Sequence, residues 1–486
     1  MPRTRRYIFN TLTVVSLLLL LATVGLATTF FVGCESSPRP VKNKLPKDQS
    51  TKTERPNVVV VLCDDLGYGD LSCYGQRKFK TPHIDRLAAE GMKFTQHYSG
   101  STVCAPSRCA LMTGLHTGHA QVRGNREVEP EGQAPMRPGT VTIPTLLRRA
   151  GYVSGMFGKW GLGAPGSDSD PAVFFDEVYG YNCQRQAHTF YPKHLWHNRT
   201  KVALDGQTYS HDLILKAAKD FIRANRDSPF FCYMPVTIPH AAMHAPKDLH
   251  DKYRKRFPRF DERIGKYAGT DVQNPVAAFP AMVEHLDGGV GEILSLLEEL
   301  GIDDNTLVMF SSDNGPHREG GHLPEFWDSN GPLKGIKRDL YEGGIRVPFL
   351  ARWPGKIEAG RTADHISAFW DMLPTFCEIA GVPSPDDLDG ISMLPTLLGK
   401  RQKAHDYLYW EFTERGGKQA IRKGNFKAVR LNVSRNPDAE IELYDLANDL
   451  GETKNIASQY PDAVRAMEKL FREARTDSRV FPLYKQ

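Results

Sequence analysis

Residues 57–67 read NVVVVLCDDLG, and this stretch carries the strongest fold signal in the chain. Its continuous apolar run, Asn57–Leu62, is typical of a strand that is buried on both faces of a parallel sheet. Asp64, Asp65 and Gly67 follow directly. Because ligands bind outside the carboxyl ends of the strands in open α/β sheets, the pattern predicts a functional site at this strand end.

Two further apolar runs have the same arrangement. Phe230–Val236 is followed by His240, and Thr306–Phe310 is followed by Asp313 and Asn314. Helical patterns separate the three runs, at 81–90, 142–150, 212–225 and 280–300. This alternation predicts a parallel sheet covered by helices, with the polar strand ends in one crevice.

The pattern changes after about residue 395. Short strand-like pieces separated by Gly, Asn and Pro cover 407–412, 419–422, 426–430 and 442–445, and a helical pattern covers 462–475. These pieces predict a small antiparallel sheet with a terminal helix. We therefore predict a main domain over residues 56–394 and a C-terminal α+β subdomain over residues 395–486.

Residues 1–33 are typical of an export signal. Arg3, Arg5 and Arg6 precede a long apolar stretch that contains no acidic residue. The end of this stretch resembles a bacterial lipoprotein signal, in which Cys34 becomes the lipidated first residue, although Phe31 replaces the usual Leu. An uncleaved membrane anchor and a cleaved soluble form are the alternatives. All three predict an exported protein, periplasmic or at the cell surface.

Residues 34–55 are polar and rich in Pro, Lys and Ser, which predicts a flexible tether between the membrane and the folded region. The net charge of the chain is +5. The three N-terminal arginines account for three of these charges, so the rest of the chain is close to neutral. This balance predicts no nucleic-acid partner.

A second informative stretch, residues 104–114, reads CAPSRCALMTG. Pro106 suits the first turn of a helix, so Cys104 would lie at a helix N-terminus, where free N–H groups favour anions. Arg108 follows one turn later and can hold a charged group with its fork of donors. A buried cysteine at an ordinary loop-to-helix junction is the alternative. The stretch resembles the maturation signal of the formylglycine-dependent sulfatases, in which a maturase oxidises the cysteine to an aldehyde.

The resemblance to this family extends over roughly residues 55–460. Matching stretches are RPNVVVVLCDDLGYGD, TPHIDRLAAEGMKF, GYVSGMFGKWGLG, AMVEHLDGGVGEIL, FSSDNG, GIKRDLYEGGIRVPFLARWPG and LYDLANDLGETKNI. The resemblance implies an alkaline-phosphatase-like α/β/α sandwich with a large mixed, mostly parallel sheet and a smaller C-terminal antiparallel sheet and helix. It also implies hydrolysis of sulfate esters, and the predicted surface location favours a sulfated carbohydrate as the substrate.

Four oxygen-bearing side chains at two strand ends predict a metal site. Asp64, Asp65, Asp313 and Asn314 offer hard ligands that suit Ca²⁺, with Mg²⁺ as the alternative. Either pair alone is also typical of a turn after a strand. The family resemblance implies the same four ligands, with the formylglycine at position 104 also touching the ion.

The resemblance further implies catalytic roles. The cation and Arg108 would hold the hydrated aldehyde, whose hydroxyl attacks sulfur. Lys159 and Lys337 would neutralise the sulfonyl oxygens, and His240 would help to protonate the leaving oxygen. Taken alone, these residues are equally typical of surface lysines and a strand-end histidine. A formylglycine-generating enzyme or an anaerobic maturase is the implied partner of Cys104.

One position departs from the family pattern. Many relatives read GKWHLG, with a histidine proposed as the base that collapses the sulfated intermediate, whereas this chain has Gly161 there. Either another base acts or this step is slower. His116 and His119 would lie one to two turns beyond Arg108 if the helix continues, and we hypothesise that His119 supplies the base.

Residues 179–196 are rich in aromatic and imidazole side chains and lie between Lys159 and His240 in the sequence. Aromatic faces together with Arg, Gln and His suit an anionic sugar. We therefore predict Arg185 and His188, together with His119, as substrate-binding residues. A well-packed insert with a Tyr/Trp core is the alternative.

Two rival functions remain open from the sequence. A phosphoester or phosphonate hydrolase of the same superfamily often uses Ser or Thr as the nucleophile and two transition metals, and this chain lacks the dense His/Asp set that a second metal needs. A surface protein that binds sulfated glycans without hydrolysing them is the rival outside enzymology, because of Gly161 or a missing maturase.

Overall fold

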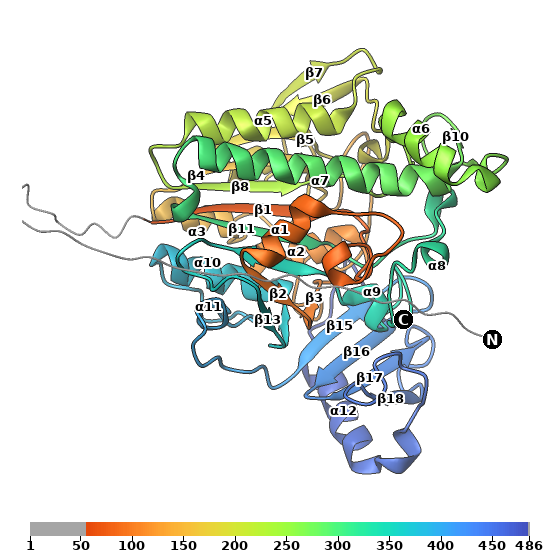
Figure 1. Ribbon diagram of the computed structural model, residues 1–486. Helices are drawn as coiled ribbons and strands as arrows, with labels where there is room; N and C mark the ends of the chain where they lie inside the picture. The colour runs from red at the N-terminus through yellow and green to blue at the C-terminus, as the bar shows by residue number, and fades with distance from the viewer. Residues whose placement is uncertain (1–54, 485–486) are drawn as a thin grey trace, which may run out of the picture. The chain divides into compact units, whose positions relative to one another are not determined.

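The computed structural model describes residues 55–484 and places ten strands in one large mixed sheet (Figure 1). The order is β13-β2-β12-β11-β1-β8-β4-β5-β6-β7. The strands are β1 (Asn57–Cys63), β2 (Met92–Phe94), β4 (Val153–Lys159), β5 (Glu177–Tyr181), β6 (His194–His197), β7 (Thr200–Ala203), β8 (Phe230–Pro235), β11 (Thr306–Ser312), β12 (Phe349–Arg352) and β13 (Arg361–Ala363). The predicted export signal, the tether up to residue 54 and Cys34 lie outside the described residues.

The centre of this sheet is parallel. Strands β11, β1, β8, β4 and β5 run parallel to one another, whereas β12 pairs antiparallel with β11 and β6 pairs antiparallel with β5. The predicted mixed, mostly parallel sheet is confirmed. Parallel strands need crossover connections, which here are mainly helical.

Twelve α-helices occur in the described residues. They are α1 (Pro82–Ala89), α2 (Cys104–Thr113), α3 (Ile143–Arg149), α4 (Pro171–Phe174), α5 (Ser210–Ala224), α6 (Lys247–Arg256), α7 (Pro275–Glu299), α8 (Pro324–Trp327), α9 (Glu342–Ile345), α10 (Met372–Ala380), α11 (Leu394–Leu397) and α12 (Pro461–Glu473). None of them combines the length and the apolar character needed to cross a membrane.

Strand β1 shows why its sequence lacks alternation. Val59 and Val61 pack into a core with α1, α5 and α7, while Val58 and Val60 pack into a second core with α2, α3 and α10. Because side chains alternate across a strand, a strand covered on both faces needs apolar residues at every position. In Figure 1, α5 and α7 lie side by side along one face of the sheet. The sheet and its two helical layers form the predicted α/β/α sandwich.

A second sheet follows in the C-terminal part of the chain. It is antiparallel, with β15 (Leu408–Phe412), β16 (Lys418–Lys423), β17 (Phe426–Leu431) and β18 (Ile441–Asp445) in sequence order. One face of it packs against α12, and the other packs against residues around α2 and α9. The predicted antiparallel sheet and terminal helix are therefore confirmed. The predicted boundary at residue 395 stays a prediction, since all described residues belong to one compact unit.

Two short strand pairs complete the structure. Strands β9 (Ile264–Gly265) and β10 (Val272–Gln273) form a small hairpin, and β3 (His97–Tyr98) pairs with β14 (Ser367–Ala368). Helix α7 begins five residues before the predicted start, because the Asn274 side chain caps it and Pro280 is accommodated within it.

Candidate active site

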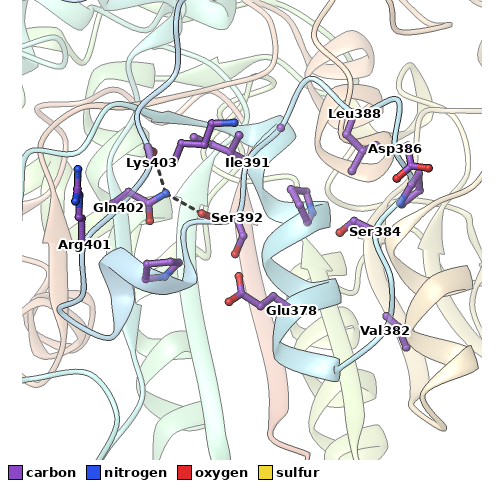
Figure 2. A pocket seen from close by; sticks show the side chains of 14 residues that line it. Glu378, Val382, Ser384, Asp386, Leu388, Ile391, Ser392, Arg401, Gln402 and Lys403 are labelled. Carbon is purple, nitrogen blue, oxygen red and sulfur yellow. Dashed lines mark hydrogen bonds between the residues drawn. The ribbon is translucent and has the colours of Figure 1, made fainter.

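A surface hollow of about 620 Å³ lies beside α10 and is drawn in Figure 2. Its lining includes Glu378, Arg401 and Lys403. None of the predicted site residues lines it. The predicted residues gather instead at the carboxyl edge of the central strands, where their side chains are buried.

Four neighbouring parallel strands deliver the site residues. Asp64 and Asp65 follow β1, Asp313 and Asn314 follow β11, and His240 lies five residues beyond the end of β8. Lys159 is the last residue of β4. Since β11, β1, β8 and β4 are adjacent in that order, their carboxyl ends meet at one edge of the sheet. The predicted convergence of three strand ends is confirmed, and β4 adds a fourth.

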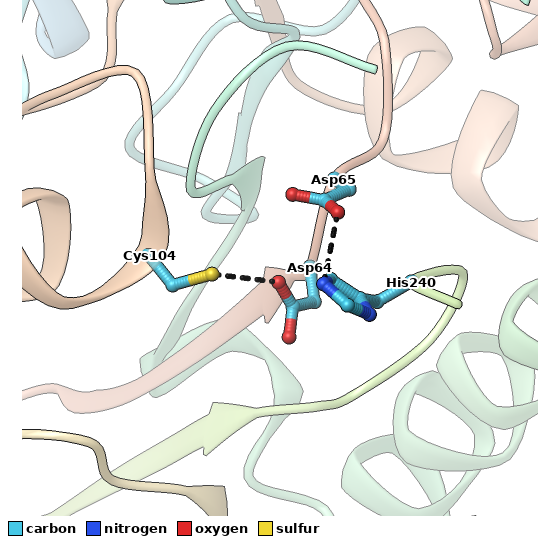
Figure 3. Close-up of side chains that lie close together, drawn as sticks. All are labelled: Asp64, Asp65, Cys104 and His240. Carbon is cyan, nitrogen blue, oxygen red and sulfur yellow. Dashed lines mark hydrogen bonds and ion pairs between the residues drawn. The ribbon is translucent and has the colours of Figure 1, made fainter. Parts of the chain in front are cut away.

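Cys104 reaches this edge from a helix. It is the first residue of α2, and its Sγ atom lies 3.4 Å from Oδ1 of Asp64. Figure 3 shows Cys104, Asp64, Asp65 and His240 turned toward one another. Burial raises the pKa of the Cys104 thiol, and the charge of Asp64 raises it further. An unmodified Cys104 is therefore a protonated thiol, which is a poor nucleophile.

Arg108 lies one turn further along α2 and binds two strand ends. Its Nε and Nη2 atoms donate to Oδ2 of Asp313 at 3.0 and 2.8 Å, and Nη1 donates to the Lys159 carbonyl at 2.7 Å. Its side chain is 1% exposed. A buried guanidinium held by three hydrogen bonds is a fixed charge, which is what an anion site requires.

Two buried lysines neutralise the paired aspartates. Lys159 Nζ donates to Asp64 Oδ2 at 2.6 Å, and Lys337 Nζ donates to Asp65 Oδ2 at 2.8 Å. Burial alone would raise the pKa of Asp64, but the charges of Lys159 and Arg108 hold it well below its usual range. Burial would lower the pKa of Lys337, but the charges of Asp65 and Glu319 raise it. Both lysines therefore carry a positive charge inside the site.

His240 is held as a neutral ring. Its Nδ1 atom contacts the Ala241 carbonyl, which assigns the proton to Nδ1. Its Nε2 atom then accepts from Lys337 Nζ at 2.9 Å. Burial and the charge of Lys337 lower the pKa of His240 well below its usual range. The Lys337–His240 contact thus holds the ring with its unprotonated Nε2 atom against a charged ammonium group.

The four oxygen-bearing side chains fit a hard divalent cation. The Asn314 Oδ1 atom is buried and has no hydrogen-bond partner among the described residues, although Nδ2 of the same amide donates to Asp65 Oδ1 at 2.6 Å. Ligand atoms of Asp64, Asp65 and Cys104 lie within 4.8 Å of one another. Burial and the neighbouring Asp64 raise the pKa of Asp313 to about 7. Crowded carboxylates and an orphaned amide oxygen are what a Ca²⁺ or Mg²⁺ ion would satisfy.

The sequence did not point to Glu319 or Arg338, which complete the charge pattern. Glu319 Oε2 accepts from Lys337 at 2.9 Å, and its Oε1 accepts from Arg338 at 2.6 Å. The linked group then holds four carboxylates and four cations: Asp64, Asp65, Asp313 and Glu319 against Arg108, Lys159, Lys337 and Arg338. A bound divalent cation would leave the group with excess positive charge, which suits an anionic substrate.

Comparison with known proteins decides which chemistry this geometry belongs to. A profile of the sulfatase family matches residues 56–382, more than half of the chain. The chain belongs to the sulfatase family. It is therefore a hydrolase of sulfate esters. A second profile, described as the C-terminal part of N-sulphoglucosamine sulphohydrolase, matches residues 336–477.

Individual relatives agree with this assignment. The N-acetylgalactosamine-6-O-sulfatase of Bacteroides thetaiotaomicron is 29% identical and aligns with 89% of this chain and 96% of its own length. Human N-acetylgalactosamine-6-sulfatase is 34% identical over 73% of this chain and 68% of its own length. Among solved structures, Ps i-CgsB in complex with k-i-k-neocarrahexaose is 28% identical, with a TM-score of 0.72, and the match covers 87% of this chain and 94% of that one.

The space beside Gly161, where many relatives carry a histidine side chain, is filled in this sulfatase. Its φ is +77°, and a Cβ at this position would lie 2.8 Å from Nε2 of Gln184. The Gln184 side chain thus fills the space beside Gly161, and its Nε2 has no hydrogen-bond partner among the described residues. An amide is no base, so Gln184 cannot replace the histidine that many relatives carry at this position. Sequence spacing gave no sign of this contact.

His119 contacts Asp389 beyond the end of α2, which argues against the hypothesis that it supplies the base. Helix α2 ends at Thr113, where Gly114 adopts a left-handed φ of +72°. Ten helical residues place the two ends of α2 about 14 Å apart. Beyond that end, His119 Nδ1 contacts Asp389 Oδ1 at 2.8 Å, and its ring stacks on His116. These contacts also argue against its predicted role in substrate binding.

The other two predicted substrate residues, Arg185 and His188, differ in their surroundings. Arg185 is half exposed and pairs with Glu127 and Glu129. His188 stacks on His240 with ring centroids 4.3 Å apart and planes 3° apart. Its Nε2 atom is buried and has no hydrogen-bond partner within the described part of the chain. The structure therefore brings His188 to the site, whereas the role of Arg185 in substrate binding stays a prediction.

Proposed function

We propose that this sulfatase releases inorganic sulfate from a sulfated carbohydrate, using a formylglycine made from Cys104 and a bound Ca²⁺. The observation that carries the proposal is the position of Cys104, on a helix N-terminus, 3.4 Å from Asp64 and surrounded by Lys159, Arg108 and Lys337. A protonated thiol in this place is a poor nucleophile, which supports its conversion to formylglycine.

Oxidation of Cys104 to formylglycine would provide the nucleophile that the protonated thiol does not. A hydrated formylglycine supplies a nucleophilic hydroxyl, and a Ca²⁺ ion supplies positive charge beside it. Asp64, Asp65, Asp313 and Asn314 would hold the ion. A formylglycine-generating enzyme or an anaerobic maturase is the partner that this proposal requires. Mg²⁺ is the second candidate for the ion, since the four oxygen ligands suit both.

The remaining residues are placed to bind and neutralise a sulfate group. Lys159 and Lys337 are buried cations on opposite sides of the aspartate pair, and their charges can meet sulfonyl oxygens. Because these side chains are buried, each charge acts more strongly than it would in water. His240 accepts from Lys337, so this pair can deliver a proton to the oxygen of the departing alcohol.

The relatives of this chain favour a sugar as the alcohol that leaves when the sulfate ester is hydrolysed. The two relatives named above are N-acetylgalactosamine-6-sulfatases, and Ps i-CgsB was solved with an oligosaccharide. A sulfated carbohydrate outside the cytoplasm also agrees with the proposed export and lipid anchoring through residues 1–34. We propose a periplasmic or cell-surface location on the basis of that N-terminal sequence.

The proposal is tested by sulfate release from matured protein. The substrates are the 6-sulfates of N-acetylgalactosamine and galactose, galactose 4-sulfate and 4-nitrophenyl sulfate, with 4-nitrophenyl phosphate and a phosphonate monoester alongside. We expect release from a sulfated sugar by wild type and none by Cys104→Ala. Cys109→Ala is the matched control, because Cys109 is a buried cysteine of the same helix outside the site.

Two results would overturn the proposal. Faster turnover of the phosphorus esters would favour a phosphoester or phosphonate hydrolase. Binding of sulfated sugars without sulfate release, by protein whose Cys104 is fully oxidised, would favour a protein that only binds glycans.

A further inference from the structure

Tyr267 is an exposed aromatic side chain placed against the buried histidines of the site. It is 45% exposed, whereas His240 is 1% exposed. Its ring centroid lies 5.6 Å from that of His240 and 5.3 Å from that of His188, with interplanar angles of 64° and 60°. Tyr267 therefore covers the edge of the His188–His240 stack and presents its other side to solvent.

The hairpin that carries Tyr267 is tied to the site by its backbone. Strands β9 and β10 pair through Gly265 and Val272, and residues 266–271 connect them. A Cβ on Gly265 would lie 2.2 Å from the Gly320 carbonyl oxygen, so the hairpin packs closely against the segment that holds Glu319. The Thr270 carbonyl contacts His244 Nε2 at 2.8 Å. These contacts fix where Tyr267 stands relative to Lys337 and His240.

The chemistry around Tyr267 differs from that around Cys104. Lys159, Arg108 and Lys337 supply the charges that a sulfate group needs, and they lie on the aspartate side of the site. On the other side of His240 lie an aromatic ring and the unpartnered Nε2 of neutral His188. A ligand there would meet the face of the Tyr267 ring and the unpartnered Nε2 atom of His188. Such a surface suits the C–H face of a sugar ring and one of its hydroxyl groups.

We propose that Tyr267 and His188 form the subsite for the alcohol part of the substrate, with the Tyr267 ring packed on a face of the sugar and His188 Nε2 bonded to a ring hydroxyl. The inference rests on the proposed function. It assigns Tyr267 to binding and positioning of the leaving group and gives it no part in holding sulfate.

The test compares Tyr267→Ala with Tyr267→Phe in matured full-length enzyme. The substrate is the sulfated monosaccharide of the panel above that wild type hydrolyses fastest, and the inhibitors are its desulfated sugar and inorganic sulfate. Tyr460→Ala is the matched control, since Tyr460 is equally exposed and packs on Phe426, in the C-terminal sheet. Both tyrosines are half exposed, so we expect all variants to fold.

For Tyr267→Ala we expect a KM about tenfold higher, from the lost contact of the sugar with the ring, and inhibition by the desulfated sugar weakened by a similar factor. We expect kcat and inhibition by inorganic sulfate to stay within about twofold of wild type, because the charged residues are untouched. Tyr267→Phe and Tyr460→Ala should resemble wild type.

The outcomes separate this subsite from the proposed function. An unchanged KM in Tyr267→Ala, or inhibition by sulfate weakened as much as inhibition by the sugar, overturns the subsite and leaves sulfatase activity on sugars intact. A wild-type enzyme that hydrolyses 4-nitrophenyl sulfate and none of the sugar sulfates overturns both.

Discussion

Removing the bound cation from matured enzyme should lower its melting temperature by about 3 °C. The carboxylates of the site already have partners: Lys159 on Asp64, Lys337 on Asp65 and Arg108 on Asp313, at 2.6 to 2.8 Å. Each charge stays neutralised without the ion, so the protein should remain folded and lose only the binding free energy of the ion.

The magnitude follows from the size of the folded part. An ion present at a hundred times its Kd stabilises the protein by about 2.7 kcal/mol. Unfolding entropy is about 2.1 cal/mol/K per residue, so the roughly 430 residues from 55 to 484 give about 0.9 kcal/mol/K. Dividing the first value by the second gives a shift of about 3 °C.

The assay is differential scanning calorimetry in EGTA and in saturating CaCl₂. We expect the shift in wild type and none in Asn314→Leu, which removes the orphaned Oδ1 ligand. Asn225→Leu is the matched control: Asn225 Nδ2 donates to the Phe221 carbonyl at the end of α5, so this variant should lose some stability and keep the whole calcium shift. A wild type that melts alike in both buffers, or a full shift in Asn314→Leu, refutes the site. Mg²⁺ acting at lower concentration than Ca²⁺ would identify the ion as Mg²⁺.

Three further predictions concern single residues. Gly161→Ala should lower the free energy of unfolding by about 1–2 kcal/mol in urea denaturation, because φ is +77° and the new Cβ meets Gln184; equal stability would contradict this. His119→Ala should release sulfate at the wild-type rate and lose about 1 kcal/mol of stability with its Asp389 contact, and a tenfold fall in kcat would return His119 to the mechanism. Burial raises the pKa of Asp70 to about 8, so the folded protein binds more protons than the unfolded chain between pH 4 and 8, and stability should fall as pH rises, by at most about 1.4 kcal/mol per pH unit. Asp70→Asn should remove that part of the slope, and an unchanged slope would show that Asp70 titrates normally.

The elements that sequence predicted well are those with local signals. Composition alone predicts buried strands for the valines of β1 and for the apolar runs before His240 and Asp313. Because these strands are neighbours in a parallel sheet, their carboxyl ends lie at one edge. The C-terminal strands were placed to within about a residue, because turn residues separate them.

Strand β4, which carries Lys159, was recognised only as a family motif and not as a strand. Its sequence VSGMFGK contains two glycines, which weaken any strand pattern. Gly158 is required by a contact between strands, because a Cβ there would lie 2.1 Å from the Pro235 carbonyl oxygen at the end of β8. A reason that lies 77 residues away cannot be seen in a local pattern.

The expected continuation of α2 toward His119 is wrong for a different reason. Gly114 was present in the sequence as a helix stop, but the hypothesis assumed that the helix continues. Glu319 and Tyr267 were missed for yet another reason. Glu319 contacts the site from a single 3₁₀ turn, Glu319–Gly321, and Tyr267 contacts it from a hairpin loop. Contacts made by such short segments leave no periodic signal in the sequence.

The central claim is that Cys104 is the precursor of the nucleophile, and the mass of the tryptic peptide 94–108 from active protein tests it most directly. We predict a mass about 18 Da below that of the unmodified peptide, since a thiol-bearing CH₂ group becomes an aldehyde. The modified fraction should rise and fall with the rate of sulfate release. A peptide with an unmodified Cys104 thiol in fully active protein would contradict the account.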